Sequence, residues 1–206
     1  MPKNKIQNEK VKERRRNEII VAATKIFAFN NYSSVTIDDI TNQLKCSHGL
    51  FYHYFENKED LFIVVMKEAI EVAKKHVYSS AKEETCAIEQ IRSIVRTTLR
   101  ITQEKNEYHV ACLYLLFNLR LQVNDVPQKE ECRASCVAAT DKMVQIIAEA
   151  QRDGAAYDDD AGELVIALVS LLKGLFFNRI MVGHQKFICP DPQIVMRLVE
   201  KQDGEK

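Results

Sequence analysis

The 206-residue sequence is poor in residues that interrupt helices, with four prolines and six glycines. Because proline and glycine are the strongest breakers of regular structure, their scarcity leaves long stretches free to form helices. Hydrophobic residues make up 46% of the chain and charged residues 28%, proportions that are typical of an ordinary soluble protein. Length and composition together predict an all-α protein with enough core for one or two domains.

The sequence also lacks a hydrophobic run of membrane length and a secretion signal. The most apolar stretch, residues 164–177, contains Lys173 and is shorter than the roughly 20 residues that a membrane span needs. Residues 1–16 are polar and mostly basic, without the apolar segment of a signal peptide. The six cysteines are scattered rather than arranged as a disulfide framework. We therefore expect no membrane association and a reduced, cytoplasmic location.

Motifs of common enzymes are missing as well. The sequence contains no glycine-rich phosphate loop, no HExxH zinc signature and no GxSxG nucleophile motif. We therefore expect a protein that is not an enzyme, that has no catalytic residues and that needs neither a cofactor nor a metal ion.

Charge is balanced over the whole chain but not along it. Residues 1–25 contain eight basic and three acidic side chains, so the remainder of this neutral chain carries an excess of acidic groups. A basic arm on a slightly acidic body suits a protein that contacts nucleic-acid phosphates with one end. A simple solvated terminus explains the same charges equally well when they are considered alone.

Residues 36–62 contain the strongest local signals. Thr36 and Asp39 have the spacing of a capping box, which predicts a helix start at this point. Ser47 can cap a second short helix after a tight turn, and a third helix is predicted to begin at Lys58. This stretch therefore predicts two short helices joined by a turn and followed by a longer helix.

The second short helix has two different sides. Phe51 and Phe55 lie one turn apart and predict a buried side. The opposite side carries His48, Gly49, Tyr52 and His53. A short helix with an aromatic core side and a polar outer side suits insertion into the major groove of DNA.

This region resembles the DNA-binding domain of TetR-family transcriptional regulators, over roughly residues 10–62. The most specific part is the pattern Gly-x-x-Tyr-x-x-Phe-x-x-Lys-x-x-Leu, which runs from Gly49 to Leu61. The resemblance implies a helix-turn-helix DNA-binding domain with its N-terminal arm at residues 1–62. Residues 63–206 would then form a larger helical domain for effector binding and dimerisation.

The resemblance also assigns roles to side chains near the turn. His48 and Leu50 match positions that meet DNA bases, while Tyr52 and Lys58 match phosphate contacts. Lys45 departs from the family, which favours glycine there, and the apolar Leu50 departs from the usual hydroxyl or amide. Tyr54 has a partly buried core position as an alternative role. The predicted DNA-binding residues are Thr36, Ser47, His48, Gly49, Leu50, Tyr52, His53, Tyr54 and Lys58.

TetR-like proteins pair their last two long helices with those of a second subunit. The helix predicted at residues 163–182 has more apolar surface than one core face requires, and Gly174 permits close approach. An ordinary core helix is the alternative interpretation. The predicted dimer-interface residues are Leu168, Leu171, Leu172 and Leu175.

The resemblance further implies a small-molecule pocket in the C-terminal domain. The chain would then be a repressor that acts as a homodimer on a palindromic DNA operator and is released by an effector. The apolar composition predicts an apolar or aromatic effector. The candidate ligand-binding residues are Tyr108, His109, Cys112, Phe117, Phe176 and Phe177, each of which also fits a plain core position.

Two other functions remain open from the residues alone. A metal- or thiol-sensing regulator could use His109 with Cys112, and Cys132 with Cys136, because each pair shares a helix face. A helical protein-interaction module without DNA binding would explain Lys45 and Leu50, the two departures from the family pattern.

Overall fold

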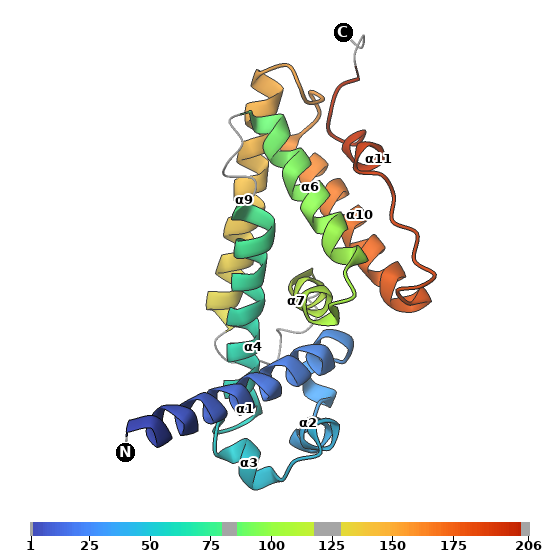
Figure 1. Cartoon of the computed structure of the whole chain (residues 1–206). Coiled ribbons are helices and arrows are strands. Elements are labelled where there is room, and N and C mark those ends of the chain that lie inside the picture. The colour runs from blue at the N-terminus through green and yellow to red at the C-terminus, as the bar shows by residue number, and fades with distance from the viewer. Residues whose placement is uncertain (1, 80–85, 118–128, 203–206) are drawn as a thin grey trace.

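The computed structural model describes residues 2–79, 86–117 and 129–202, and it confirms the predicted all-α fold (Figure 1). An antiparallel bridge between Ala156 and Glu200 is the single β contact in these ranges. The helices are α1 (Pro2–Phe29), the 3-10 helix η1 (Tyr32–Ser34), α2 (Ile37–Leu44), α3 (His48–Tyr52), α4 (Lys58–Ala73), the π-helix η2 (Lys74–Tyr78), α6 (Ala87–Gln103), α7 (Glu107–Phe117), α9 (Lys129–Arg152), α10 (Ala161–Val182) and α11 (Pro192–Met196).

The buried apolar residues form two clusters. We call the first the N-terminal core, which α1 to α4 build around Phe27, Phe51 and Phe55. The second, the C-terminal core, lies between α6, α9, α10 and α11 and includes Ile91 and Phe176. Burying aromatic and aliphatic side chains in this way is the main favourable contribution to folding of each part.

Two helices contribute to both cores. In α4, Val65 and Met66 belong to the N-terminal core, while Ala73 belongs to the C-terminal core. Helix α7 is divided in the same way, as Ala111 lies in the N-terminal core and Val110 in the C-terminal core. Figure 1 shows α7 between α1 and the pair α6 and α10. The predicted domain boundary after residue 62 therefore falls inside a continuous helix.

Helix limits differ from the sequence prediction in two places. The first helix begins at Pro2 rather than near Lys10, so the basic arm continues as helix. The predicted long helix to residue 80 is α-helical only to Ala73, and the next turn is the π-helix η2. Single π-turns inside helices mark local insertions and are frequent at functional sites. Pro127, a predicted helix start, lies outside the described residues.

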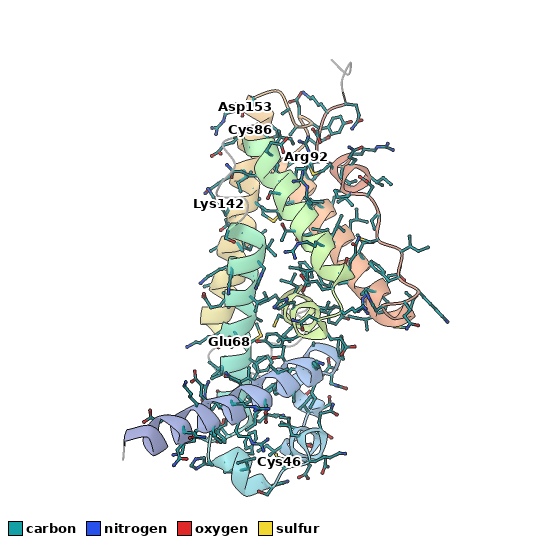
Figure 2. All side chains as sticks on the ribbon, in the orientation of Figure 1. Cys46, Glu68, Cys86, Arg92, Lys142 and Asp153 are labelled. Atoms are coloured by element: carbon teal, nitrogen blue, oxygen red, sulfur yellow. The ribbon has the colours of Figure 1, made fainter. Side chains whose placement is uncertain are left out.

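The C-terminal segment is fixed across the end of the helical bundle. Arg92 of α6, which Figure 2 labels near that end, pairs with Glu89 and with Glu200. The backbone N–H of Tyr157 donates to the carbonyl oxygen of Val199 at 2.9 Å. These contacts hold α11 against α6 and so cover the C-terminal core.

Candidate nucleic-acid interface

The turn between α2 and α3 has the geometry of a helix-turn-helix. The predicted capping box is confirmed: the backbone N–H of Asp39 donates to the Thr36 hydroxyl at 3.1 Å, and that of Thr36 donates to the Asp39 carboxylate at 2.8 Å. Hydrogen bonds from Thr36 hold the pKa of the Asp39 carboxyl below its usual value. Lys45 ends α2 in the left-handed conformation, with φ 52° and ψ 45°. The turn therefore forms without glycine, at a cost of about 1–2 kcal/mol.

Helix α3 presents one buried and one exposed side, as predicted. The Ser47 hydroxyl caps it by accepting a 3.2 Å hydrogen bond from the N–H of Leu50. Phe51 is fully buried in the N-terminal core, whereas Tyr52 is 55% exposed. The outward surface of α3, which we call the α3 outer face, consists of His48, Gly49, Tyr52 and His53.

Gly49 lies on this face, and neither its backbone conformation nor its packing against the described residues requires glycine. An added Cβ atom would lie 3.8 Å from the Ser47 hydroxyl oxygen, an ordinary contact distance, and the backbone is helical. Packing inside the chain would therefore accept alanine, which is a better helix former. A glycine that the chain itself does not need is typical of a position where another molecule comes close to the backbone.

His48 contacts the neighbouring helix. Its Nε2 atom lies 2.5 Å from a carboxylate oxygen of Asp38 in α2, and both side chains are more than half exposed. The contact orients the imidazole across the gap between the two short helices. Leu50 and Tyr54 are half-buried, and Tyr54 packs against the N-terminal core, in agreement with its alternative core role.

Lys58 is directed toward the chain rather than into solvent. Its ammonium group donates hydrogen bonds to the carbonyl oxygens of Tyr32 at 2.9 Å and Val35 at 2.8 Å. Burial lowers the pKa of this ammonium group. Two of its three donor hydrogens are thus committed within the chain, which leaves one for a predicted phosphate contact.

One basic residue of the first helix, Arg16, contacts the segment that follows α3. Figure 1 shows that the N-terminal half of α1 projects away from the body of the molecule. Arg14 and Arg15 both pair with Glu18, and hydrogen bonding from Arg15 lowers the pKa of that carboxyl. The Arg16 guanidinium carbon lies 5.3 Å from the centre of the Phe55 ring, which is a cation–π contact.

Five of the six candidate ligand-binding residues lie on the inner sides of their helices. Cys112 and Phe176 are fully buried, and the rings of Phe117 and Phe176 meet edge to face at 5.3 Å. Tyr108 and His109 are half-buried on α7. Because successive helical residues point about 100° apart, the sixth residue, Phe177, cannot share the direction of Phe176. Its side chain is 53% exposed on the outside of α10, which corrects its assignment to an internal pocket.

The four predicted interface leucines also divide into two groups. Leu168 and Leu172 are buried in the chain's own C-terminal core, and Leu175 packs against that core. Leu171 alone has substantial exposure. Leu168 and Leu172 are therefore corrected to core residues, since side chains covered by α6 and α9 are not available to a second subunit.

A different set of α10 side chains forms an exposed apolar stripe. Ile166 is 66% exposed and Met181 is 67% exposed. Sequence reasoning missed these positions because α10 is apolar on almost every side. By length and composition α10 could cross a membrane, a test that the core helix of a soluble protein also passes. The α10 stripe consists of Ile166, Leu171, Phe177, Met181 and Val182.

The cysteines give no sign of a metal centre among the side chains that the structure describes, which contain no cluster of three or more potential ligands. Burial raises the pKa of the Cys112 thiol to about 12, so this thiol stays protonated and weakly reactive. Figure 2 shows Cys46 and Cys86 at opposite ends of the molecule. The side chains of Cys132 and Cys136, the other predicted pair, lie outside the described residues.

Capped short helices, a tight turn and an exposed polar face define a helix-turn-helix DNA-binding protein. Residues 19–65 match the family model described as "Bacterial regulatory proteins, tetR family". Residues 19–65 therefore have the DNA-binding domain of the TetR family of bacterial regulators.

A curated relative supports the same assignment. The HTH-type transcriptional regulator HbdR of Aromatoleum sp. (strain CIB) is 32% identical over 89 residues, which are 43% of this chain and 39% of the relative. The match thus spans about two fifths of the relative's length.

Solved structures extend the likeness to nearly the whole fold. AibR in complex with isovaleryl coenzyme A and operator DNA has a TM-score of 0.70 at 14% identity, covering 89% of this chain and 95% of that chain. A regulator from Saccharomonospora viridis in complex with choline has a TM-score of 0.67 at 18% identity, covering 91% of this chain and 98% of that one.

Proposed function

We propose that this chain is a cytoplasmic repressor that binds a palindromic operator as a homodimer and is released by a small molecule. The observation that carries the proposal is the α3 outer face, where Gly49 leaves the helix backbone open between exposed polar side chains. A helix of this kind, held by its buried aromatic side, fits the major groove.

Side chains on and next to this face would make different kinds of contact with DNA. His48 and Leu50 would meet base edges, with Leu50 contributing apolar contact to a thymine methyl group. Tyr52 and Lys58 would meet phosphate oxygens, which position the protein without selecting a sequence. The other proposed DNA contacts are Thr36, Ser47, His53 and Tyr54.

Dimerisation would bury the α10 stripe. Single exposed apolar side chains are normal on protein surfaces, but several on the exposed side of one helix are typical of an interface. The stripe extends over most of α10, from Ile166 to Val182, with the open Gly174 within this span. Pairing two copies through a two-fold axis would place two α3 helices on successive half-sites.

Effector binding in the C-terminal core would reach DNA through α7. Helix α7 packs closely on both α1 and α4. Across the junction with α1, Lys25 pairs with Glu107 at 3.1 Å and the ring of Phe29 lies 5.6 Å from that of Tyr114. A ligand that displaces α7 must therefore displace the DNA-binding helices as well. Release requires that the ligand bind the two arrangements unequally.

The effector itself is proposed as a small apolar or aromatic molecule. The solved relatives hold ligands as different as isovaleryl coenzyme A and choline, so the shared fold accommodates several chemistries. The half-buried Tyr108, His109 and Phe117 next to the fully buried Cys112 and Phe176 provide a mainly apolar lining.

The test is a fluorescence-anisotropy titration with DNA from beside the protein's own gene and from a pooled genomic library, against random DNA. We expect saturable binding that weakens steeply with salt. Binding no tighter than that to random DNA with either source would contradict the proposal. Parallel sedimentation of the complex should give two chains per DNA duplex.

A further inference from the structure

Arg179 is a buried cation, and no acidic partner for it lies among the residues that the structure describes. It lies in the last turn of α10, and its residue surface is only 6% exposed. Its Nε atom donates a 3.1 Å hydrogen bond to the carbonyl oxygen of Thr102 at the end of α6. Within residues 2–79, 86–117 and 129–202, neither terminal nitrogen of the guanidinium has a hydrogen-bond or carboxylate partner.

The side chains of Thr102, whose carbonyl oxygen accepts this hydrogen bond, and of nearby Glu104 already have hydrogen-bond or ion-pair partners. The Thr102 hydroxyl donates to the carbonyl oxygen of Leu99 at 2.6 Å. Glu104, two residues further on, pairs with Arg100 at 3.0 Å and with His109 at 2.8 Å. The carboxylate of Glu104 is therefore already paired with two other side chains.

An uncompensated buried charge is unfavourable, because the guanidinium loses its hydration without gaining a counter-ion. The side chain could fulfil a purely structural role with Nε alone, since that hydrogen bond satisfies the end of α6. The two terminal nitrogens remain, and their fixed planar arrangement matches the two oxygens of a carboxylate. These N–H donors without an acceptor indicate a binding site for a ligand of opposite charge.

Buried apolar side chains precede this cation on the same side of α10. Phe176 precedes Arg179 by one helical turn on α10, and its ring meets that of Phe117 from α7. Leu172, a further turn back, is buried in the same C-terminal core. An anion bound by Arg179 would thus have its remaining atoms among aromatic and aliphatic groups.

We propose that Arg179 anchors the effector, and that the effector is an organic acid whose carboxylate lies against the guanidinium and whose body is apolar. This inference rests on the proposed effector function of the C-terminal domain and specifies its ligand class. The carboxylate would replace the missing counter-ion, while the apolar body would contact Phe117 and Phe176.

The experiment compares acids with their neutral amides, using octanoate with octanamide and 4-phenylbutyrate with 4-phenylbutyramide. Thermal shift and calorimetry on the whole chain should show binding of at least one acid, at least about tenfold tighter than its amide, because the amide lacks the charge. Equal binding of acid and amide, or binding of neither acid, would overturn the proposal. This comparison uses the unmodified protein and so does not depend on a variant that folds.

Variants then test whether Arg179 causes the preference for the acid over the amide. Arg179→Gln should abolish the difference between acid and amide, and Arg179→Lys should retain part of it. Arg197→Gln, at an exposed arginine just after α11, is the matched control and should leave the preference unchanged. An acid preference that survives Arg179→Gln would place the anion elsewhere and overturn the assignment.

Operator binding is measured separately to keep the two proposals apart. If the chain binds its operator and is released by neutral compounds alone, the Arg179 inference is wrong and the regulator function stands. If acids bind with the expected preference while no DNA source is bound specifically, the site stands and the proposed operator function is wrong.

Discussion

The ammonium group of Lys58 lies 2.8 Å from the carbonyl oxygen of Val35, which joins the first turn of α4 to the segment that precedes α2. The same group donates to Tyr32 at 2.9 Å and lies 4.3 Å from the centre of its ring. One cation thus satisfies two carbonyl groups beside the helix-turn-helix. Lys58 therefore stabilises the fold through contacts within the chain, in addition to its proposed contact with DNA.

Lys58→Met should lower the free energy of unfolding by about 1–3 kcal/mol, because two carbonyl groups lose a charged donor while the apolar stem is retained. Urea denaturation followed by circular dichroism measures this loss. Lys67→Met, at an exposed lysine of the same helix, should change stability by no more than about 1 kcal/mol. Equal losses in the two variants would contradict an internal role for Lys58.

Gly49→Ala separates stability from DNA binding. The added methyl group has room and alanine favours helix, so the unfolding free energy should stay constant or rise by up to about 1 kcal/mol. The same methyl group would occupy the surface that meets DNA, so operator affinity should fall at least about tenfold. Fluorescence anisotropy measures the operator affinity and thermal melting measures the stability of the same sample. An unchanged affinity would show that DNA does not approach α3 at Gly49.

Ile166→Glu should convert the proposed dimer into monomers, because a charge in the α10 stripe would be buried there without a partner. Ile188→Glu is the matched control, since Ile188 is 85% exposed but lies outside α10. Sedimentation velocity at micromolar concentration should show one species near a single chain mass for the first variant and an unchanged dimer for the second. A dimer in both would place the interface on another surface.

Phe29→Ala tests the route from effector to DNA. The Phe29 ring contacts Tyr114 across the junction of α1 and α7, and it is partly exposed, so its loss should leave the DNA-binding helices intact. Operator affinity without effector should change less than about threefold, while the weakening produced by effector should shrink. Full release by effector in this variant would show that coupling does not pass through this contact.

Stability should depend on pH through His76. Burial, followed by the nearby His109, lowers the pKa of His76 from its ordinary value of 6.5, and the two rings are 4.7 Å apart. The unfolded chain therefore binds more protons than the folded chain below about pH 6.5. Unfolding free energy should then fall as pH decreases from 7 to 5. His76→Gln should flatten this dependence in urea titrations, and an unchanged slope would refute the assignment.

Local signals in the sequence were sufficient for the helix-turn-helix. Thr36 and Ser47 cap helices where hydroxyl spacing predicts them, and Lys45 adopts the left-handed conformation that the family pattern implies at that position. These features depend on neighbours within a few residues, so sequence patterns identify them. The inward hydrogen bonds of Lys58 depend on η1, more than twenty residues away, and no local pattern reveals them.

The C-terminal domain was less predictable. Helix α10 is apolar on most sides, so its periodicity cannot distinguish the side that packs on α6 from the side that is exposed. For that reason the sequence places Leu168 and Leu172 on the outer side and does not single out Ile166. Arg179 carried a usable signal, a lone arginine within an apolar run, but its burial and missing partner required the tertiary structure.

Because α4 and α7 belong to both cores, the two halves of this protein cannot be exchanged as separate parts. A fragment ending at residue 62 would lack Val65 and Met66 of α4 and Ala111 and Leu115 of α7, all of which complete the N-terminal core. A chimaera that transfers a new sensor domain onto this helix-turn-helix must therefore carry the matching faces of both helices. Engineering a new effector specificity therefore requires grafting these interface residues, and joining two sequences after residue 62 is not enough.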